Sequence, residues 1–420
     1  MFEVVTRTTK EKKPYKAGLE LTKEIINYFN DQPDIILLYC TGHIKSKKDH
    51  ELLLKGIWEK LSDNTKVIGC DVNGFITNNG CFAKGIVALA IKADNIKVTC
   101  SFGKNTKRNP KKAAKQFLKN IKSDENNKFK HKLLVTNISG MEMPKSGSSS
   151  PIIKSKIVGN FILILLKIIQ KLKQQGFPRD DEILKYISKE LSDFDIIYGA
   201  SGSLVNMSEN YQFYNKEVLR ESIVGLIIET NDNYFLDYAN AAEETKIKLN
   251  ITKLSKDKHI IKNLNNKPAL SEFLKVMNWK MDDFEKAKWI DITSKYPFAY
   301  YQNGKIFLRP ILMISGDYLG CLAQIEKNNI FLVKMSRDKM VESVDELLYP
   351  KKPDFGLFTS CIARQGFLGV KVFQVQEKLK NYFQEKPFLL IYTGGEGIKK
   401  QNQDIEYLNE TITCTIFNRD

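Results

Sequence analysis

The chain has 420 residues, of which 42% are hydrophobic and 10% aromatic, and it carries a formal net charge of +16. This length exceeds one ordinary core and predicts two large parts, while the apolar content excludes an intrinsically disordered protein. The positive charge alone leaves open an anionic ligand, nucleic acid, a membrane surface or a lysine-rich solvated exterior.

The cysteine content and the apolar runs predict a cytoplasmic protein without a membrane span. The seven cysteines include no C-x-x-C pair, which favours a reducing compartment. The opening "MFEVVTRTTKEKK" lacks the apolar centre of a signal peptide. The most hydrophobic run, 157–170, is interrupted by Lys167 before it reaches the ~18 apolar residues of a span. We therefore expect a buried helix there.

The first part of the chain reads as an α/β unit. In chain order, the patterns indicate a helix at 17–30, an apolar strand at 34–40, a helix at 49–61, a glycine turn within 66–80, and two β-type runs that turn at 93–95. A basic stretch follows at 104–122, with apolar residues at helical spacing. It predicts an amphipathic helix with a solvated basic face, and its lack of interleaved aromatics argues against a nucleic-acid role.

The same order then recurs. A strand at 131–140, two helical segments, a glycine turn at 195–204 and two β-type runs that turn at 231–233 follow one another. We interpret this as a duplicated unit of strand, helix, strand, glycine turn and hairpin, with repeats at about 30–105 and 130–238. Two such units would leave a crevice where their glycine turns face each other.

From 239 to 417 the patterns change to a second domain with several β-type runs and interspersed helices. The expected fold class is therefore α/β, or mixed α+β, with a mixed sheet in the C-terminal domain. The Ser- and Gly-rich stretch 143–151 is expected to be a surface loop or a lid.

Motifs for metal or serine chemistry are weak. The four histidines are far apart in sequence and no H-E-x-x-H occurs, so no metal site is predicted. "GASGS" departs from G-x-S-x-G because Ser203 stands where glycine is required. Cys361 is expected to be a buried strand cysteine, or a nucleophile if a distant histidine reaches it.

Polar residues end several apolar strands in the C-terminal part. They are Arg309, Cys361, Arg364, Tyr392, Glu396 and Asn409. Two arginines can clamp a carboxylate, and Glu396 can accept hydrogen bonds from a ligand ammonium, so together they would suit a zwitterion. Ion pairs among these same residues are the alternative. The glycines around Glu396 in "YTGGEG" would expose it at a strand end.

Several segments, in their order along the chain, resemble the FIST-domain proteins. "VIGCDVNGFITNNG" is similar to the family's G-C-[ST]-x-x-G-E-I segment, with Phe75 in place of Glu. "IIYGASGS" resembles the second glycine turn, and "YPFAYYQNGKIFLRPIL" the H-P-L…R segment, with Tyr296 in place of His. "FTSCIAR" and "LIYTGGEGIKKQNQDIEYLNETIT" resemble the C-x-x-R and Y-T-Y-G-E-I…N-x-T segments. The resemblance extends from about residue 15 to 417.

The resemblance implies an archaeal or bacterial intracellular sensory protein, with a FIST N-terminal domain at 15–238 and a FIST C-terminal domain at 239–417. It implies binding of a small ligand such as an amino acid, no cofactor, and signalling to a partner protein in trans. A haem-binding nitric-oxide sensor, or an enzyme that uses Cys361 or Glu396, stays open as an alternative. The expected ligand-binding residues are Gly69, Cys70, Asn73, Gly74, Gly199, Ser201, Arg309, Cys361, Arg364, Tyr392, Gly395, Glu396 and Asn409.

Overall fold

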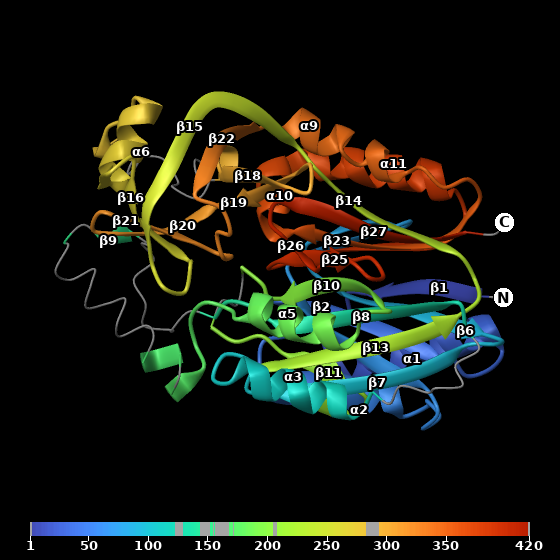
Figure 1. Cartoon of the computed structure of the whole chain (residues 1–420). Helices are drawn as coiled ribbons and strands as arrows, with labels where there is room; N and C mark the ends of the chain where they lie inside the picture. Colours follow the sequence, from blue (N-terminus) through green and yellow to red (C-terminus); the bar gives the residue numbers. More distant parts are fainter. Residues whose placement is uncertain are drawn as a thin grey trace.

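In a computed structural model, three six-stranded sheets with equivalent strand orders form the body of the molecule (Figure 1). The structure describes residues 2–121, 129–142, 152–153, 155, 168–170, 172–204, 208–282 and 294–418. Apolar runs such as "IILLYCT" are buried along their whole length, as expected for strands covered on both faces.

The strand order is equivalent in the three sheets. The first runs β1 (Phe2–Thr9), β6 (Ile86–Ala93), β2 (Ile35–Thr41), β3 (Lys66–Val72), β11 (Gln212–Tyr214), β12 (Glu217–Leu219). The second runs β7 (Lys97–Lys104), β13 (Ser222–Thr230), β8 (His131–Ser139), β10 (Asp195–Ser201), β25 (Glu396–Lys399), β26 (Glu406–Leu408). The third runs β14 (Tyr234–Asn240), β27 (Thr411–Asn418), β23 (Pro353–Cys361), β24 (Phe388–Thr393), β4 (Gly74–Thr77), β5 (Gly80–Phe82). In each sheet the third and fourth strands are parallel to each other, and the other neighbours are antiparallel.

Each sheet takes four strands from one stretch of the chain and a hairpin from another. We call these stretches copy 1 (residues 2–93), copy 2 (97–230) and copy 3 (234–418). The hairpin β11–β12 of copy 2 completes the sheet of copy 1, β25–β26 of copy 3 completes that of copy 2, and β4–β5 of copy 1 completes that of copy 3. The exchange closes a ring. The sequence patterns identified this unit twice, and in the structure its strand order occurs three times.

The turns at 93–95 and 231–233 do not close hairpins, so that prediction was wrong. β6 pairs with β1 and β2, whereas β7 pairs with β13 in another sheet. β13 and β14 are likewise separated, because β14 pairs with β27. Each last strand already has two partners within its own copy, so the turn leads to the edge of the next sheet and marks a border between copies.

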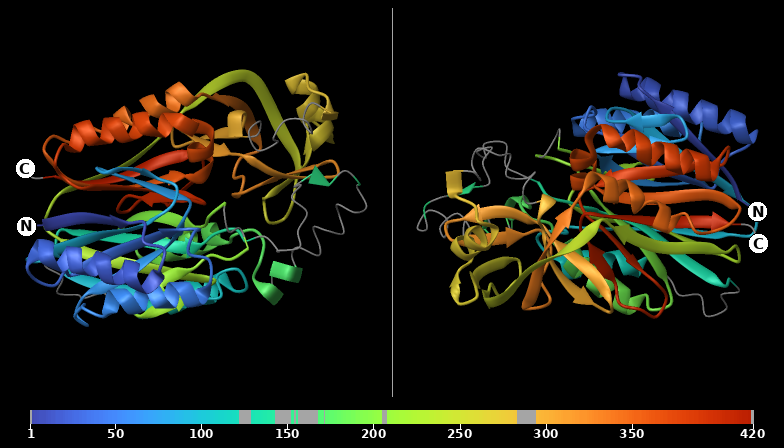
Figure 2. Two further views of the ribbon diagram at one scale, coloured as in Figure 1. Left: turned by 180° about the vertical axis from the view of Figure 1, so that it is seen from behind. Right: turned by 90° about the horizontal axis from the view of Figure 1, so that it is seen from above.

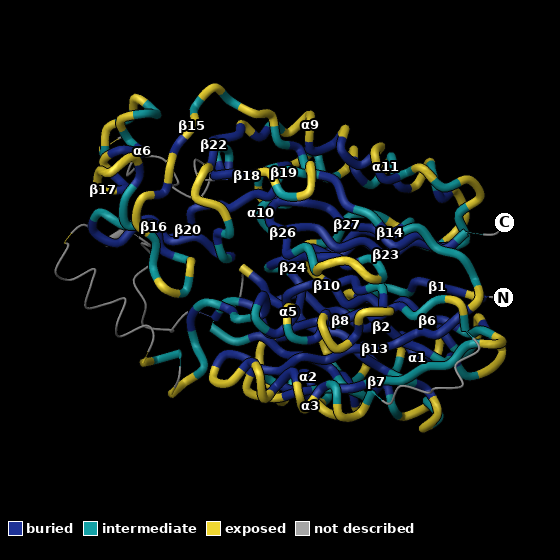
Figure 3. Tube along the Cα trace, viewed as in Figure 1, coloured by how far each residue is buried: buried dark blue, intermediate teal, exposed yellow. Residues whose placement is uncertain are grey.

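Amphipathic helices cover the outer faces of the sheets. They are α1 (Pro14–Phe29) and α2 (Lys47–Trp58) in copy 1, α3 (Pro110–Lys119) and α5 (Asp180–Glu190) in copy 2, and α9 (Arg337–Glu342), α10 (Ile362–Leu368) and α11 (Val372–Phe383) in copy 3. The basic stretch predicted to be helical forms α3, which buries Ala113, Ala114 and Phe117. The inner faces of the three sheets share one core, and the exposed residues gather on the outer helices (Figure 3).

A fourth sheet lies to one side of the body (Figure 2), and all its strands except β9 come from between β14 and β23 in the sequence. Its path is β19 (Lys305–Arg309), β18 (Phe298–Gln302), β22 (Asn329–Met335), β15 (Ala242–Leu254), β16 (Ile260–Leu264), β21 (Tyr318–Cys321), β20 (Ile311–Ser315), β9 (Ile152–Ile153), and β17 (Lys267–Pro268) pairs with β16. Helix α6 (Ala269–Met277) and the short helices η1 (Asp345–Leu347) and η2 (Gly369–Lys371) complete the elements. The predicted mixed α/β class is confirmed.

Two predictions concern segments that the structure does not describe. The stretch expected to be a surface loop or lid, 143–151, lies outside the described residues. The helix expected at 157–170 lies outside them except for its last three positions, which are helical. Of the helices in the described part of the chain, none has both the length and the apolarity to cross a membrane.

Replacement of Phe75 by alanine tests the exchanged hairpin. Phe75 belongs to copy 1, is fully buried in the sheet of copy 3, and stacks on Phe82 with 4.8 Å between ring centroids. Phe75→Ala is expected to lower the free energy of unfolding by about 3–5 kcal/mol, measured by urea denaturation. Phe373→Ala is the control, because Phe373 is 61% exposed and its loss should change stability by at most about 0.5 kcal/mol. Equal effects would contradict the pairing.

Candidate functional site

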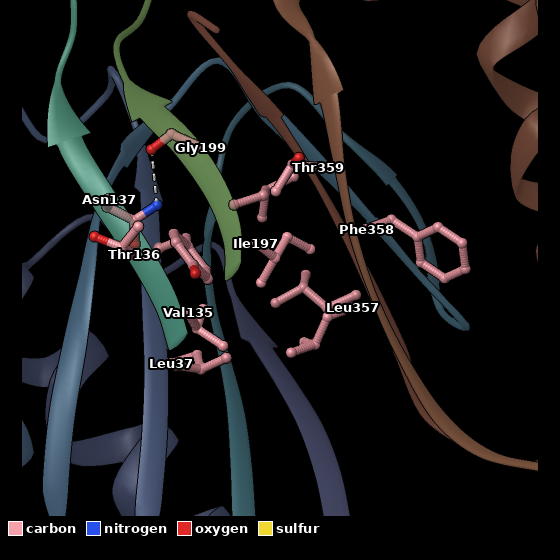
Figure 4. A pocket seen from close by; sticks show the side chains of 12 residues that line it. Leu37, Val135, Thr136, Asn137, Ile197, Gly199, Leu357, Phe358 and Thr359 are labelled. Carbon is pink, nitrogen blue, oxygen red and sulfur yellow. Dashed lines mark hydrogen bonds between the residues drawn. The ribbon is translucent and has the colours of Figure 1, made fainter. Parts of the chain in front are cut away.

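A small cavity lies where the inner faces of the three sheets meet (Figure 4). Its lining residues are Leu37, Tyr39, Val135, Thr136, Asn137, Ile197, Gly199, Leu357, Phe358, Thr359, Leu389 and Ile391. The amide of Asn137 donates a hydrogen bond to the carbonyl of Gly199 across 3.1 Å. With a volume of about 20 Å³, the cavity has room for about one water and is too small for an amino acid.

A group of buried polar side chains at the C-terminal ends of β23 and β24 has more chemical capacity. We call it the C-terminal polar cluster, and its members are Cys361, Arg364, Tyr392, Glu396, Asn409 and Glu410. The sequence predicted five of these six as ligand-binding residues, and Glu410 was missed. Each of the six is at most 4% exposed.

Arg364 is the positive group of the cluster. It follows β23 on α10 and is 1% exposed. Its Nη2 donates hydrogen bonds to the carbonyl of Met340 at 2.8 Å and to Ser343 Oγ at 3.0 Å. Its Nε and Nη1 are buried and have no partner among the described residues. Half of the guanidinium fork is therefore free to bind an anion.

The acceptors of the cluster come from β25 and from the turn before β27. Glu396 Oε1 accepts two hydrogen bonds of 2.8 Å, from the backbone N and from Oγ1 of Thr411. Its Oε2 has no partner in the described structure. The same is true of both amide atoms of Asn409 and the hydroxyl of Tyr392, while the Glu410 carboxyl interacts with the side chain of Ser294. Buried polar atoms in proteins normally have partners, so this concentration makes the cluster the candidate site among the described residues.

Burial decides the protonation of the acids. It raises the pKa of Glu396 to about 8, although the hydrogen bonds from Thr411 and the charge of Arg364 oppose the shift. Burial raises the pKa of Glu410 well above its ordinary value, and the neighbouring Glu396 adds to the shift, although a hydrogen bond from Ser294 and the charge of Arg364 oppose it. Burial, Glu396 and Glu410 also raise the pKa of the Cys361 thiol. A thiol held in this form is a poor nucleophile, which weighs against an enzyme that uses Cys361.

The glycine turn of copy 1 reaches this cluster. Asn73 Nδ2 donates a 2.8 Å hydrogen bond to the side chain of Gln365, next to Arg364, and the backbone N of Asn73 donates to the carbonyl of Tyr392. Gly74 lies against the Gln365 side chain, where a Cβ would be 2.4 Å from Nε2. Of the expected ligand-binding residues in the first glycine turn, Asn73 and Gly74 therefore lie beside the C-terminal polar cluster.

The remaining predicted residues occupy other environments. In β3, Cys70 is buried in the central core and Gly69 leaves no room for a Cβ beside the carbonyl of Leu38. Gly199 lines the small cavity, and Gly395 accepts a backbone hydrogen bond from Ala200.

Two further predicted residues are engaged by protein groups. Ser201 donates to Asn210 Oδ1 and accepts from Gln212 Nε2 within copy 2. Arg309 donates to the carbonyls of Gln324 and Leu308 and to the hydroxyl of Tyr300. All three nitrogens of its guanidinium therefore have partners, and the structure does not place Arg309 among the cluster's free donors.

The strand register identifies counterparts of the cluster in copy 2. Ile138 pairs with Ile223, as Ser360 pairs with Ile412. Glu142 lies four residues after Ile138, as Arg364 lies four residues after Ser360. Glu221 lies two residues before Ile223, as Glu410 lies two residues before Ile412. The two glutamates share a left-handed backbone, with φ of 53° and 55°. The backbone N of Ser222 donates to Gln212 Oε1 at 3.1 Å, just as Thr411 donates to Glu396.

In copy 2 a lysine of the chain pairs with the acids. Lys107 Nζ, fully buried, lies 3.1 Å from Glu221 Oε2, 3.8 Å from Glu142 Oε2 and 3.2 Å from Ser139 Oγ. Arg220 contributes a second cation, 3.0 Å from Glu142. In the described part of copy 3, Glu410 has no such lysine, because the chain leaves β14 for the fourth sheet at the place where copy 2 supplies Lys107.

Comparison with models of protein families shows to which family the chain belongs. The model of the FIST N domain matches residues 34–267, more than half of the chain. The chain belongs to the FIST family. FIST domains are sensory domains associated with small-ligand binding.

Other known proteins add little to this FIST assignment. No curated protein matches the chain. A crystal structure of cyanuric acid hydrolase from A. caulinodans aligns over 100% of both chains, with 6% identity and a TM-score of 0.33. A second cyanuric acid hydrolase structure covers 57% of this chain and 73% of its own, with 8% identity and a TM-score of 0.27. At these scores neither alignment carries a conclusion about fold or function.

The Glu396→Gln variant tests the electrostatics of the cluster. Glu396 keeps its proton up to about pH 8 in the folded chain but loses it near pH 4.5 when unfolded. The free energy of unfolding should therefore fall as pH rises from about 4.5 to 8, by at most about 1.4 kcal/mol per pH unit from this group. In Glu396→Gln that part of the slope should vanish, as urea denaturation at several pH values would show. Parallel curves for both proteins would contradict the assignment.

Proposed function

We propose that this FIST protein is an intracellular sensory module that binds an amino acid, or a similar small molecule with an ammonium and a carboxylate, in the C-terminal polar cluster. The ligand carboxylate would accept hydrogen bonds from Nε and Nη1 of Arg364. Its ammonium would donate to Glu396 Oε2 and to Glu410. The single observation that carries the proposal is one cluster of buried donors and acceptors that have no hydrogen-bond partner among the described residues.

The energetics of burial support a ligand rather than an internal ion pair. An isolated buried guanidinium or carboxylate costs several kcal/mol unless it is paired and hydrogen-bonded. Arg364 and Glu396 influence each other's pKa, yet no direct hydrogen bond or ion pair joins them in the described structure. A molecule with one charge of each sign would satisfy both groups.

The equivalent site in copy 2 supports the proposal that the ligand carries an ammonium group. There the position equivalent to Glu410 is Glu221, which binds the primary ammonium of Lys107. The same backbone geometry in copy 3 presents Glu410 without a lysine from the described chain. A free primary amine placed like Lys107 Nζ would restore the contact that copy 2 makes internally.

The exchanged hairpin offers a route from binding to signalling. Arg364 belongs to the helices of copy 3, while Glu396 lies on β25, whose Cα partner for that residue is Gly199 in the sheet of copy 2. A ligand between them would link the two sheets and alter how copies 2 and 3 pack. We propose that a separate partner protein reads this change.

Thermal-shift assays with a panel of L-amino acids, small amines and small carboxylates would test the ligand class. A ligand present at 100 times its Kd should add about 2.7 kcal/mol of stability. We expect a dose-dependent rise in melting temperature with at least one amino acid, and a smaller rise, or none, with its deaminated or decarboxylated analogue. Stabilisation by none of the panel would count against the proposal.

Variants of the two charged anchors would locate the site. Arg364→Lys and Glu396→Gln should each weaken binding of that amino acid at least tenfold by calorimetry, since each removes a buried charged hydrogen bond. Arg309→Lys is the matched control, because Arg309 is equally buried but its donors are used by the protein. It should lower stability while leaving affinity unchanged. Anchor variants that bind within twofold of the unmodified protein would refute the site.

Binding should also release a proton. At pH 7 the Glu396 carboxyl is mostly protonated, because burial raises its pKa to about 8. An ammonium held against Oε2 would lower this pKa, so about one proton should leave per ligand bound. Calorimetry at pH 7 in phosphate and in Tris, which differ in ionisation enthalpy, would measure it. Equal heats in the two buffers would show that Glu396 does not lose a proton on binding.

A further inference from the structure

A second polar group lies on the outer face of the first sheet, apart from the C-terminal polar cluster. It consists of Cys40 on β2, Asp71 on β3 and His50 on α2, all buried. Their ligand atoms, one from each residue, lie within 4.8 Å of one another. Because Cys40 and Asp71 stand side by side on parallel strands, their side chains point to the same face and meet the helix that covers it.

A hydrogen bond from Nδ1 fixes the orientation of the His50 ring. Its Nδ1 lies 2.8 Å from the carbonyl oxygen of Ser46, which can only accept, so Nδ1 carries a hydrogen. Ser46 is itself held by the capping box that begins α2, in which it exchanges hydrogen bonds with Asp49. This is the arrangement that orients metal-bound histidines, with one ring nitrogen donating to a carbonyl and the other facing the ion.

The Nε2 side of the His50 imidazole faces the Asp71 carboxylate, which also contacts the Cys40 thiol. His50 Nε2 is 2.8 Å from Asp71 Oδ1, and Cys40 Sγ is 2.9 Å from that same oxygen. Asp71 Oδ2 accepts a 2.9 Å hydrogen bond from the backbone N of Tyr211, which holds the carboxylate in place. The contacts of His50 and Cys40 with Asp71 are direct hydrogen bonds, in which the thiol and a hydrogen on Nε2 of His50 point at the carboxylate, and although burial opposes it, Asp71 raises the pKa of His50. A metal ion that replaced these two hydrogens would engage the same three ligand atoms after a small outward shift.

A nearby histidine adds an independent sign. The Nε2 of His43 is buried and has no partner within the described residues. Its Nδ1 lies 2.9 Å from Oγ1 of Thr41, the residue that follows Cys40, so His43 lies near the group. A tetrahedral ion held by three protein ligands has a fourth position, which a histidine or a water can fill.

We propose that Cys40, His50 and Asp71 form a binding site for one Zn²⁺ ion. A thiolate, an imidazole and a carboxylate make a ligand set suited to zinc and unsuited to the hard ions Ca²⁺ and Mg²⁺. On binding, the Cys40 thiol and Nε2 of the His50 imidazolium each give up a proton to solvent, and His50 then binds as neutral imidazole through Nε2. The ion would link two strands of copy 1 to the helix that covers them.

The experiment uses the full chain, freed of metal with a chelator under reducing conditions. Equilibrium dialysis against Zn²⁺ should give one ion per chain, and Co²⁺ in its place should produce a thiolate-to-cobalt charge-transfer band in the near ultraviolet. Cys40→Ser should abolish that band, and His50→Gln should lower Zn²⁺ affinity at least tenfold. Cys70→Ser is the matched control, because Cys70 is also buried and adjoins Asp71 but faces the central core. It should retain both the band and the affinity.

Several outcomes would overturn the site. They are uptake well below one ion per chain, or uptake and a cobalt band that persist in both variants. If the variants fail to fold, X-ray absorption of the zinc-loaded unmodified protein decides. We expect a sulfur at about 2.3 Å and nitrogen or oxygen at about 2.0–2.1 Å. A zinc without sulfur among its neighbours would refute the proposal and leave a hydrogen-bonded His50–Asp71 pair.

Discussion

The exchange of hairpins among the three copies is the constraint on which the rest of the structure depends. β4 is complete within the first 80 residues of the chain, yet its partner β24 lies more than 300 residues later. No copy completes its own sheet, so the three sheets must form together. Contacts of such separation are costly in loop entropy and slow to form, and the shared central core provides the apolar burial that offsets this cost.

The same exchange places one equivalent, buried position in each of the three sheets, and a different type of residue occupies it each time. Glu396, Gln212 and Phe75 are the first inward residues of the three exchanged hairpins, and all three are fully buried. In copy 1 the position is apolar, and in copy 2 an amide sits among internally paired charges. In copy 3 it carries a carboxyl group whose second oxygen has no partner among the described residues. The three copies therefore bury different chemical groups at one repeated position.

Local patterns in the sequence predicted the strands, the mixed fold class and five members of the C-terminal polar cluster, because a polar residue that ends an apolar strand is visible without a structure. Pairing was not visible, so the turns at 93–95 and 231–233 were misread as hairpins. The third copy was hidden because the fourth sheet separates β14 from β23. A signal existed in "LRESI" and "LNETI", which align Glu221 with Glu410. Convergence of Cys40, His50 and Asp71 depends on register and helix packing, which spacing does not encode.

The closed ring also means that the pairing pattern has no topological beginning. The two ends of the chain lie side by side (Figure 1), and the ring of Phe2 packs edge-on against that of Phe417 with 5.0 Å between centroids. Joining the ends and opening the turn at 93–95 would move copy 1 behind copy 3 while keeping every strand partner. A circular permutant of this kind would start at β7. The fold therefore does not depend on the order in which the three copies are synthesised.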